Sequence, residues 1–244
     1  MDCSVTLLCW AWFIFGFFFF YSWRYLLHAV FSREPQRHFQ RLNHSFYQIF
    51  FAILKFAAPL QKIEIDETVS GIRSGVVISN HLSYLDPLLL ISVYKQHKTI
   101  VKAKFFSMAI FGWVITKAGY IPATSEGRLS RIMIDQMETM DAYFKGGGNL
   151  FVFPEGTRSR DGEIGPLHQG ALKIARMFKV PVYVLRICNS DKLFTPGKFF
   201  FNTREENIIR VELIDCIDPD YQMAPPSTAE LEVRVRQAFT RVGA

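Results

Sequence analysis

The chain has 244 residues, of which half are hydrophobic and 24 are phenylalanine, so it suits one well-buried domain with an appendage and is unlike a freely soluble protein. The formal net charge of +6 at pH 7 suits a polyanionic surface, either nucleic acid or acidic phospholipid, and does not choose between them. A zinc site or a disulfide is disfavoured because the four cysteines show neither Cys-x-x-Cys spacing nor a companion histidine at metal-ligand distance: Cys3, Cys9, Cys188 and Cys216.

An uncharged apolar segment opens the chain. It runs from Cys3 to Trp23, and about 20 apolar residues are what a helix needs to cross a bilayer core. It has no basic start and no small-residue cleavage site, so a removable secretory signal is the weaker interpretation. Asp2 precedes the segment and arginines follow it, and the arginine side is normally cytoplasmic. We therefore expect a membrane protein whose main domain faces the cytosol; the arginines are Arg24, Arg33, Arg37 and Arg41.

A second helical pattern follows, with apolar residues on one side and polar residues on the other. It predicts a helix that lies along the membrane surface or one whose apolar face packs on the globular domain, and both can be partly true. We expect residues 1–60 to form the membrane-attachment helices, as one membrane helix or a two-helix motif, and residues 61–244 to form the catalytic domain. The apolar side is Phe39, Leu42, Phe46, Ile49, Phe50, Ile53 and Ala57; the polar side is Arg37, Arg41, His44 and Gln48.

From about Gly71 onward, short β-rich runs alternate with helical patterns, which indicates an α/β protein whose helices cover a sheet. The predicted strands are Val76–Ser79, Thr99–Val101, Leu150–Phe153, Pro181–Ile187 and Ile208–Leu213. The predicted helices are Tyr84–Lys95, Phe105–Lys117, Arg128–Phe144 and Gly170–Phe178. A terminal helix follows the turn-rich Ala224-Pro225-Pro226-Ser227, with Thr228 as its expected N-cap.

The first motif with chemical content is Asn80-His81-Leu82-Ser83-Tyr84-Leu85-Asp86, which leaves a predicted strand and enters a helix. If Asp86 accepts a hydrogen bond from one ring nitrogen of His81, the other nitrogen is unprotonated and can take a proton from an attacking hydroxyl. An alcohol is a poor nucleophile, and a placed base contributes about 10²- to 10⁴-fold. The structural alternative is that Asp86 closes a capping box with Ser83 and that His81 is an ordinary loop histidine.

The second motif is Phe153-Pro154-Glu155-Gly156-Thr157-Arg158, directly after another predicted strand. Open α/β sheets bind ligands outside the carboxyl ends of their strands. Gly156 allows close approach of the backbone, and Arg158 can bind a phosphate through two hydrogen bonds. The motif therefore favours a phosphorylated substrate, against the alternative of a solvated turn with stray arginines.

Taken together, the two motifs resemble the glycerolipid acyltransferase family, typified by the bacterial lysophosphatidate acyltransferases, which carries an Asn-His-x₄-Asp block and a Phe-Pro-Glu-Gly-Thr-Arg block in this order. The match extends to Lys104 with Phe111-Gly112-Trp113 and Gly119-Tyr120-Ile121-Pro122 between the blocks, and to Val180-Pro181-Val182 after them. It covers roughly Val76 to Ile187. The resemblance implies an α/β fold with a central mixed sheet flanked by helices.

The resemblance also implies roles for individual residues. His81 would be the general base and Asp86 would orient it, while Lys104 and the turn formed by Glu155, Gly156, Thr157 and Arg158 would bind the acceptor and its phosphate. It implies acyl-CoA or acyl carrier protein as acyl donor, a lysolipid as acceptor, and no metal or further cofactor. The expected activity is that of a 1-acyl-sn-glycerol-3-phosphate acyltransferase of phospholipid biosynthesis.

One departure from the family pattern concerns the acceptor. Members that use glycerol phosphates usually continue after the Ile-Pro pair with a hydrophobic residue, Asp and a phosphate-binding Arg, whereas this chain reads Ala123-Thr124-Ser125, with Arg128 as the nearest candidate. Another lysolipid acceptor, such as a lyso-ornithine lipid, is therefore an alternative.

Two other activities compete with acyl transfer. A lipid esterase is disfavoured because no Gly-x-Ser-x-Gly elbow is present, so that direct transfer without an acyl-enzyme is the simpler mechanism. A non-catalytic membrane adaptor whose basic face binds anionic lipid is a further alternative. Nucleic-acid binding ranks last because the charge lies beside a membrane segment and no nucleic-acid module is present.

Overall fold

The computed structural model describes residues 2–124, 126–156, 158 and 165–243. Its centre is a seven-stranded sheet with the order β1-β7-β6-β2-β5-β3-β4. Strands β6 and β7 pair antiparallel, and every other pair of neighbours is parallel, so the predicted mixed α/β sheet is confirmed. The strands are β1 Gln61–Ile65, β2 Val76–Ser79, β3 His97–Val101, β4 Ile121–Pro122, β5 Asn149–Val152, β6 Val182–Cys188 and β7 Asn207–Ile217.

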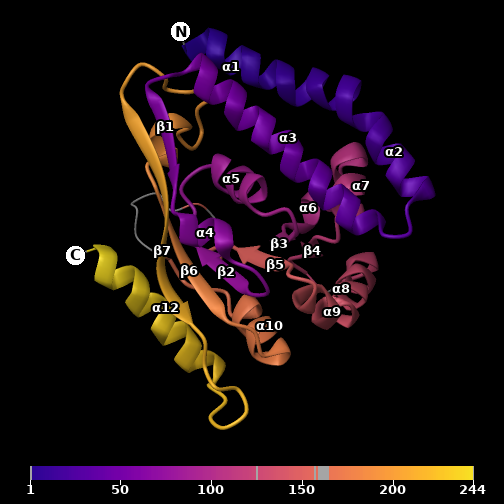
Figure 1. Ribbon diagram of the computed structural model, residues 1–244, viewed down its shortest axis with the longest axis vertical. Coiled ribbons are helices and arrows are strands. Elements are labelled where there is room, and N and C mark those ends of the chain that lie inside the picture. The colour runs from indigo at the N-terminus through magenta and orange to yellow at the C-terminus, as the bar shows by residue number, and fades with distance from the viewer. Residues whose placement is uncertain (1, 125, 157, 159–164, 244) are drawn as a thin grey trace.

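Helices cover both faces of the sheet (Figure 1). Four of them belong to the N-terminal quarter of the chain: α1 Asp2–Ala11, the π-helix η1 Trp12–Tyr21, α2 Ser22–Phe31 and α3 Pro35–Ala57. The others are α4 Glu67–Gly71, α5 Leu85–Val93, α6 Ala103–Phe106, α7 Ala109–Lys117, α8 Arg128–Glu138, α9 Met140–Lys145, α10 Gly170–Phe178, α11 Ser190–Leu193 and α12 Thr228–Gly243.

Successive side chains of the central strands point to opposite faces of the sheet, so the interior is divided into two hydrophobic cores. Val77 of β2 and Phe151 of β5 face one core, which they share with α3, α5 and α7. Val76 and Leu150, one residue earlier on the same strands, face the other core together with α9, α10 and α12. This arrangement follows from the period-2 geometry of strands that are buried on both faces, which explains their continuous apolar sequences.

The N-terminal helix lies along helix α3. Asp2–Phe31 forms a helical run of 30 residues that is long and apolar enough to cross a membrane. It packs antiparallel against α3: Trp12 Nε1 donates to the carbonyl of Phe46 (3.3 Å), and the Tyr25 hydroxyl donates to Asn43 Oδ1 (2.5 Å). Most of the run's outer apolar surface stays exposed.

Helix α3 packs on the globular domain through its contacts with α5 and α7. Ten of its residues are buried, so the second of the two sequence interpretations describes its apolar face. His44, which the pattern places on the polar side, is buried and its Nδ1 bonds to the Ile91 carbonyl (3.0 Å). Tertiary packing therefore buries more of this helix than its periodicity indicates.

A chain of buried polar groups links α2 to the sheet. The Tyr25 hydroxyl bonds to Asn43, the Asn43 amide donates to the Tyr120 hydroxyl (3.3 Å), and that hydroxyl bonds to Nε2 of His97 on β3 (2.8 Å). Nδ1 of His97 bonds to the Tyr94 carbonyl (2.7 Å), which assigns the proton to Nδ1. Complete burial lowers the pKa of His97 to about 3, so the ring stays neutral.

Two predicted helices and one predicted N-cap are wrong. The expected helix Phe105–Lys117 is divided into α6 and α7, and the expected helix Arg128–Phe144 into α8 and α9. The N-cap of α12 is Ser227 and not Thr228, because the Ser227 hydroxyl accepts from the Glu230 N–H and the Glu230 carboxylate accepts from the Ser227 N–H. This reciprocal pair is a capping box shifted by one residue.

Candidate active site

The two sequence motifs meet at one edge of the sheet. Strands β2 and β5 are parallel neighbours, with Val76 opposite Leu150, so the loops that follow them leave the sheet side by side. The backbone N–H of His81 donates to Glu155 Oε1 (3.2 Å), which joins the two loops directly. The adjacency that the motifs require is therefore present.

His81 and Asp86 form a hydrogen-bonded pair. His81 Nδ1 lies 3.0 Å from Asp86 Oδ2, and the same oxygen accepts from the backbone N–H groups of Leu82 and Ser83, both at 2.7 Å. The Asp86 side chain is fully buried and that of His81 is largely buried. With Nδ1 engaged by the carboxylate, the neutral ring leaves Nε2 unprotonated, which is the form of a general base.

The loop that carries His81 is fixed from both sides. Asn80 exchanges two hydrogen bonds with the backbone of Ile187 at the end of β6, donating to its carbonyl (2.8 Å) and accepting from its N–H (2.7 Å). The Ser83 hydroxyl donates to the Phe194 carbonyl (2.9 Å). The imidazole itself stacks on the ring of Phe153, with centroids 4.4 Å apart. These contacts restrict the rotation of the histidine.

The turn after β5 requires a glycine and presents an arginine. Two features of this position favour glycine: Gly156 has φ +65°, and an added Cβ would lie only 3.2 Å from the His168 ring. The guanidinium of Arg158 stacks on Tyr84, 3.7 Å from the ring centroid, and its Nη2 donates to the Tyr84 hydroxyl (2.9 Å). Thr157 lies outside the described residues.

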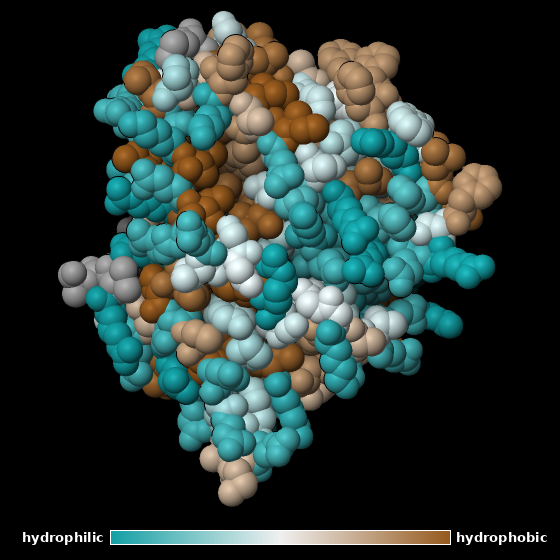
Figure 2. Space-filling model, viewed as in Figure 1, coloured by the Kyte–Doolittle hydropathy of each residue, from teal (hydrophilic) through white to brown (hydrophobic). Residues whose placement is uncertain are grey.

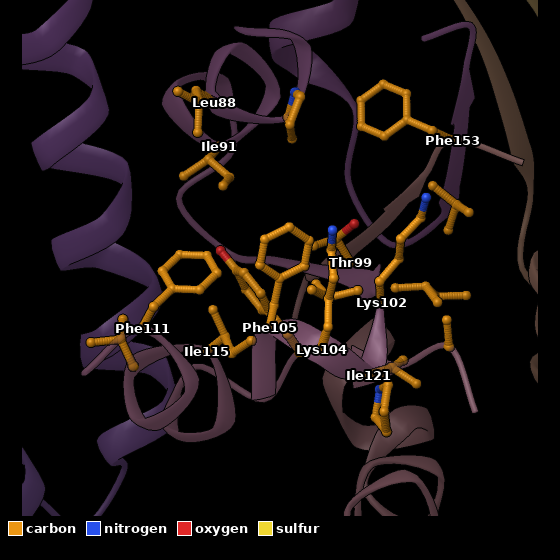
Figure 3. A pocket seen from close by; sticks show the side chains of 18 of the residues that line it. Leu88, Ile91, Thr99, Lys102, Lys104, Phe105, Phe111, Ile115, Ile121 and Phe153 are labelled. Carbon is orange, nitrogen blue, oxygen red and sulfur yellow. The ribbon is translucent and has the colours of Figure 1, made fainter. Parts of the chain in front are cut away.

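A cavity of about 1920 Å³ opens beside the His81–Asp86 pair. His81, Lys104, Gly156 and Arg158 line it, whereas Asp86 and Glu155 lie behind the lining. Its walls are mainly apolar and come from η1, α3, α5, α6, α7 and β3; Figure 3 shows Leu88 and Ile91 on one side and Phe111 and Ile115 on another.

The charged side chains that line the described part of the cavity have one sign. Among the described lining residues, four are lysine or arginine and none is aspartate or glutamate: Lys102, Lys104, Arg158 and Lys173. In Figure 3 the side chains of Lys102 and Lys104 extend into the cavity, toward Phe153. The site therefore suits a ligand that joins an apolar chain to an anionic group.

Sequence reasoning missed Lys102 and Lys173. Lys102 directly follows β3, the neighbour of β5, so its position at a parallel strand end was a usable signal; Lys173 has no comparable signal. Arg128 starts α8 on the surface and does not belong to the cavity lining, whereas Ala123 and Thr124 do. The structure therefore gives no contact between Arg128 and the cavity.

Comparison with known proteins agrees with this geometry. The family model described as Acyltransferase matches residues 61–187, slightly more than half of the chain. The chain belongs to the acyltransferase family. The matched region begins at β1 and ends in β6, so it contains both motifs and the strands that position them.

Several curated relatives are named 1-acyl-sn-glycerol-3-phosphate acyltransferase. A chloroplast protein of Brassica napus is 34% identical over 122 residues, which are 50% of this chain and 35% of that protein. One from Arabidopsis thaliana is 32% identical over 142 residues, 57% of this chain and 39% of that protein. One from Helicobacter pylori is 24% identical over 72% of this chain and 73% of its own. The chain thus spans well under half the length of the two plant relatives.

A solved structure has the same fold. The crystal structure of the 1-acyl-sn-glycerophosphate acyltransferase PlsC from Thermotoga maritima superposes with a TM-score of 0.71 at 20% sequence identity, and covers 98% of this chain and 94% of that chain. The likeness extends over the N-terminal helices as well as the sheet, which confirms the expected architecture.

Proposed function

We propose that this chain is a 1-acyl-sn-glycerol-3-phosphate acyltransferase, which transfers a fatty acyl group from acyl-CoA or acyl carrier protein to the hydroxyl of a lysophospholipid. One observation carries the proposal: the His81–Asp86 pair borders an apolar cavity whose described charged lining is entirely cationic. A lysophosphatidate matches that cavity because it joins an acyl chain to a phosphate. Family membership and the names of the relatives support the same reaction.

The reaction needs one base and no covalent intermediate. His81 Nε2 takes the proton of the acceptor hydroxyl as its oxygen attacks the thioester carbonyl, and the tetrahedral oxyanion that forms is stabilised by nearby donors and cations. The oxyanion then collapses, the C–S bond breaks, and the thiolate leaves with the proton carried by His81. Asp86 stabilises the transient imidazolium.

Phosphate binding falls to the cations of the cavity. Arg158 offers a planar guanidinium already oriented by Tyr84, and Lys102, directly after β3, and Lys104 of α6 add positive charge. Gly156 would contribute by close approach of the turn, and the expected contribution of Thr157 concerns a residue outside the described ones. For Glu155, predicted to bind substrate, we propose a positioning role, since a carboxylate repels phosphate: it accepts from the backbone of His81 and of Gly165 (3.4 Å) and so links the loops.

Membrane attachment follows from the N-terminal helices, which we assign as an attachment unit, residues 1–60, of a catalytic domain, residues 61–244. The run Asp2–Phe31 is bonded to the rest of the chain at its start and in its second half: Asp2 accepts from Thr203 (2.7 Å), and Tyr25 donates to Asn43. On the basis of these contacts, we propose that the helix lies in the interface together with the domain and does not cross the bilayer. Such a protein stays on the leaflet where it is made, here the cytoplasmic one.

The decisive experiment supplies labelled acyl-CoA, or acyl carrier protein, with a panel of lysolipids. We expect the wild-type protein to form phosphatidate from lysophosphatidate and His81→Ala to lose the reaction by about 10²-fold or more. His38→Ala removes a histidine outside the cavity and serves as the matched control. Retained transfer in His81→Ala would remove the general-base assignment, and release of free fatty acid without any acceptor would favour an esterase.

A second acceptor class is favoured by one observation. Ala123 and Thr124 occupy the cavity wall where glycerol phosphate acyltransferases usually continue toward an arginine, and Arg128 lies outside. A lysolipid with another headgroup, such as lyso-ornithine lipid, is therefore the alternative substrate. Product formed from that lysolipid and none from lysophosphatidate would select it.

Full function in cells after loss of both His81 and Glu155 would instead indicate a non-catalytic membrane adaptor.

A further inference from the structure

A surface loop after α11 exposes two adjacent aromatic rings. Phe199 and Phe200 are 58% and 50% exposed, and they meet edge to face at 5.2 Å. The next residue, Phe201, turns inward and packs edge to face on Phe194 at 4.8 Å. The loop is therefore anchored from below while two large apolar side chains face outward, an arrangement that is costly in water unless something covers it.

The loop is bound to the first turns of the N-terminal helix. The Phe201 N–H donates to the Thr6 hydroxyl (2.9 Å), the Thr203 N–H donates to Asp2 (3.0 Å), and Arg204 forms an ion pair with Asp2 (2.9 Å). The ring of Phe199 stacks on Trp10, with centroids 5.8 Å apart and planes 8° apart. In Figure 1 this orange loop lies beside the start of α1.

The two phenylalanines extend an apolar surface that already exists. Leu7 and Leu8 on α1 and the outer residues of η1 and α2 are also exposed. Figure 2 shows brown and tan patches, interrupted by polar atoms, in the upper part of the molecule, where Figure 1 places the N-terminal helices. Exposed residues of the α6–α7 turn, Met108 and Ile110, line the cavity, as does Pro196 at the start of the loop. Ile14 and Phe18 of η1 are likewise exposed and line the cavity, so the apolar surface adjoins the apolar part of its wall.

The chemistry of the loop suits lipid. Lys198 immediately precedes the rings and is exposed, and Arg204 follows them, so cations flank the apolar pair as they do in segments that bind an anionic membrane surface. Aromatic rings bind at the boundary between headgroups and acyl chains, which is about 5–10 Å deep. A second copy of the chain would need a matching acidic surface, which none of these elements provides.

We propose that Phe199 and Phe200 insert into the lipid monolayer as a second anchor beside the N-terminal helix, which sets the tilt of the protein and holds the cavity against the lipid from which the acceptor enters. This rests on the proposed membrane location of the N-terminal helices.

A tryptophan at position 200 measures the insertion directly. The full chain carrying Phe200→Trp is reconstituted in vesicles of phosphatidylcholine and phosphatidylglycerol with brominated acyl chains. We expect the brominated lipid to quench the tryptophan fluorescence of this variant more than that of the wild-type protein, whose four tryptophans set the baseline. The matched control is Val233→Trp, which is 52% exposed on α12, across the sheet, and should add none. If the tryptophans introduced at positions 200 and 233 both add no quenching to that of the wild-type protein, the proposal is overturned.

Activity in two environments gives the second readout. We expect the double variant Phe199→Ser with Phe200→Ser to lose roughly tenfold in kcat/KM with substrate in vesicles, because half-exposed phenylalanines no longer enter the lipid. With substrate in detergent micelles it should match the wild-type protein. Equal loss in both environments, or loss in neither, would contradict the insertion. The proposed function is tested separately: it fails if the wild-type protein transfers no acyl group in micelles, whatever the quenching at position 200.

Discussion

A single carboxylate oxygen links the two sequence interpretations of Asp86. Its Oδ2 accepts from the backbone N–H groups of Leu82 and Ser83, which are capping contacts, and also from His81 Nδ1. The capping alternative and the catalytic one are therefore compatible. The backbone contacts fix the carboxylate, and the fixed carboxylate orients the ring.

Asp86→Asn tests the orienting role. The amide keeps one oxygen for the backbone N–H groups, so the fold should survive, but it no longer stabilises an imidazolium. We expect kcat to fall by about 10²-fold or more, measured with saturating substrates. Asp141→Asn, at an exposed position of α9, is the control and should retain full activity. An active Asp86→Asn protein would limit Asp86 to capping.

Tyr84 positions Arg158. Since the guanidinium stacks on the ring and also donates to its hydroxyl, Tyr84→Leu should release the arginine, whereas Tyr84→Phe keeps the stacking. We expect Tyr84→Leu to raise the KM for lysophosphatidate about twofold to fivefold with little change in kcat, the size of an exposed cation–π contact. A fall in kcat alone, with KM unchanged, would show that the ring does not act through phosphate binding.

Lys98 is buried where a cation is unfavourable. The side chain of Lys98 is fully buried. Its Nζ has no hydrogen-bond partner among the described residues and lies 4.4 Å from the Tyr143 ring centroid. Burial lowers its pKa from 10.5 to about 8. Below pH 8 the folded protein buries a charge, so this residue's contribution to stability should rise with pH between about 8 and 10.5.

Lys98→Met should therefore stabilise the protein at pH 7. The substitution removes the free-energy cost of burying the charged amine, up to about 3 kcal/mol, and also removes the favourable cation–π interaction with Tyr143, which offsets part of the gain. Thermal unfolding in detergent at several pH values measures it, and the increase in stability above pH 8 should be smaller in the variant. Lower stability of Lys98→Met at pH 7 would show that the ring fully compensates the buried amine.

At the scale of elements, the close packing of α6 on α7 depends on a glycine. A Cβ at Gly112 would lie 2.4 Å from the carbonyl oxygen of Phe106 and 2.8 Å from its carbonyl carbon. Helix α6 therefore crosses α7 with backbone against backbone, which a continuous helix over this segment cannot do. The result places Lys104 on the cavity wall.

Gly112→Ala should displace α6. Both clashing atoms belong to the backbone, so no side-chain rotation relieves the contact. We expect a loss of about 1–3 kcal/mol in stability, and a raised KM as Lys104 moves. Thermal unfolding and steady-state kinetics measure the two effects. Gly71→Ala, where nothing lies within 4 Å of the added Cβ, is the matched control. Wild-type values for Gly112→Ala would mean that α6 shifts freely.

The sequence predicts the buried strands well and the edge strands poorly. Strand β2 has the predicted bounds because four consecutive β-branched or small residues are buried on both faces. The edge strands β1 and β4 were missed: β1 reads Gln-Lys-Ile-Glu-Ile and is half polar, and β4 has two residues including Pro122. The motif histidine and its carboxylate were predictable, but the cavity cations depend on tertiary packing that periodicity does not encode.

For the whole molecule, hydropathy predicts a segment that can span, whereas the contacts tie it to one domain. Trp12, Tyr21 and Tyr25 all bond to α3, and Asp2 bonds to the loop after α11. Hydropathy measures only the cost of leaving water, so it cannot separate crossing a bilayer from lying in it.

Protease protection distinguishes the two arrangements. Tags placed before Met1 and after Ala244 should be digested together in inverted membrane vesicles and protected together in right-side-out ones, because a helix lying in one leaflet keeps both ends on one side. A tag before Met1 that is cleaved only in right-side-out vesicles would show that the segment crosses.

The N-terminal helix also supplies part of the cavity wall, through Phe13, Ile14, Phe17 and Phe18. The proposed membrane anchor and the proposed ligand cavity therefore share one helix. A hybrid in which an unrelated transmembrane helix replaces residues 2–31 would reach the membrane with His81 and Asp86 intact, yet its acyl site would be open to water along one side. Engineers who wish to relocate this fold would have to transplant the helix together with the domain.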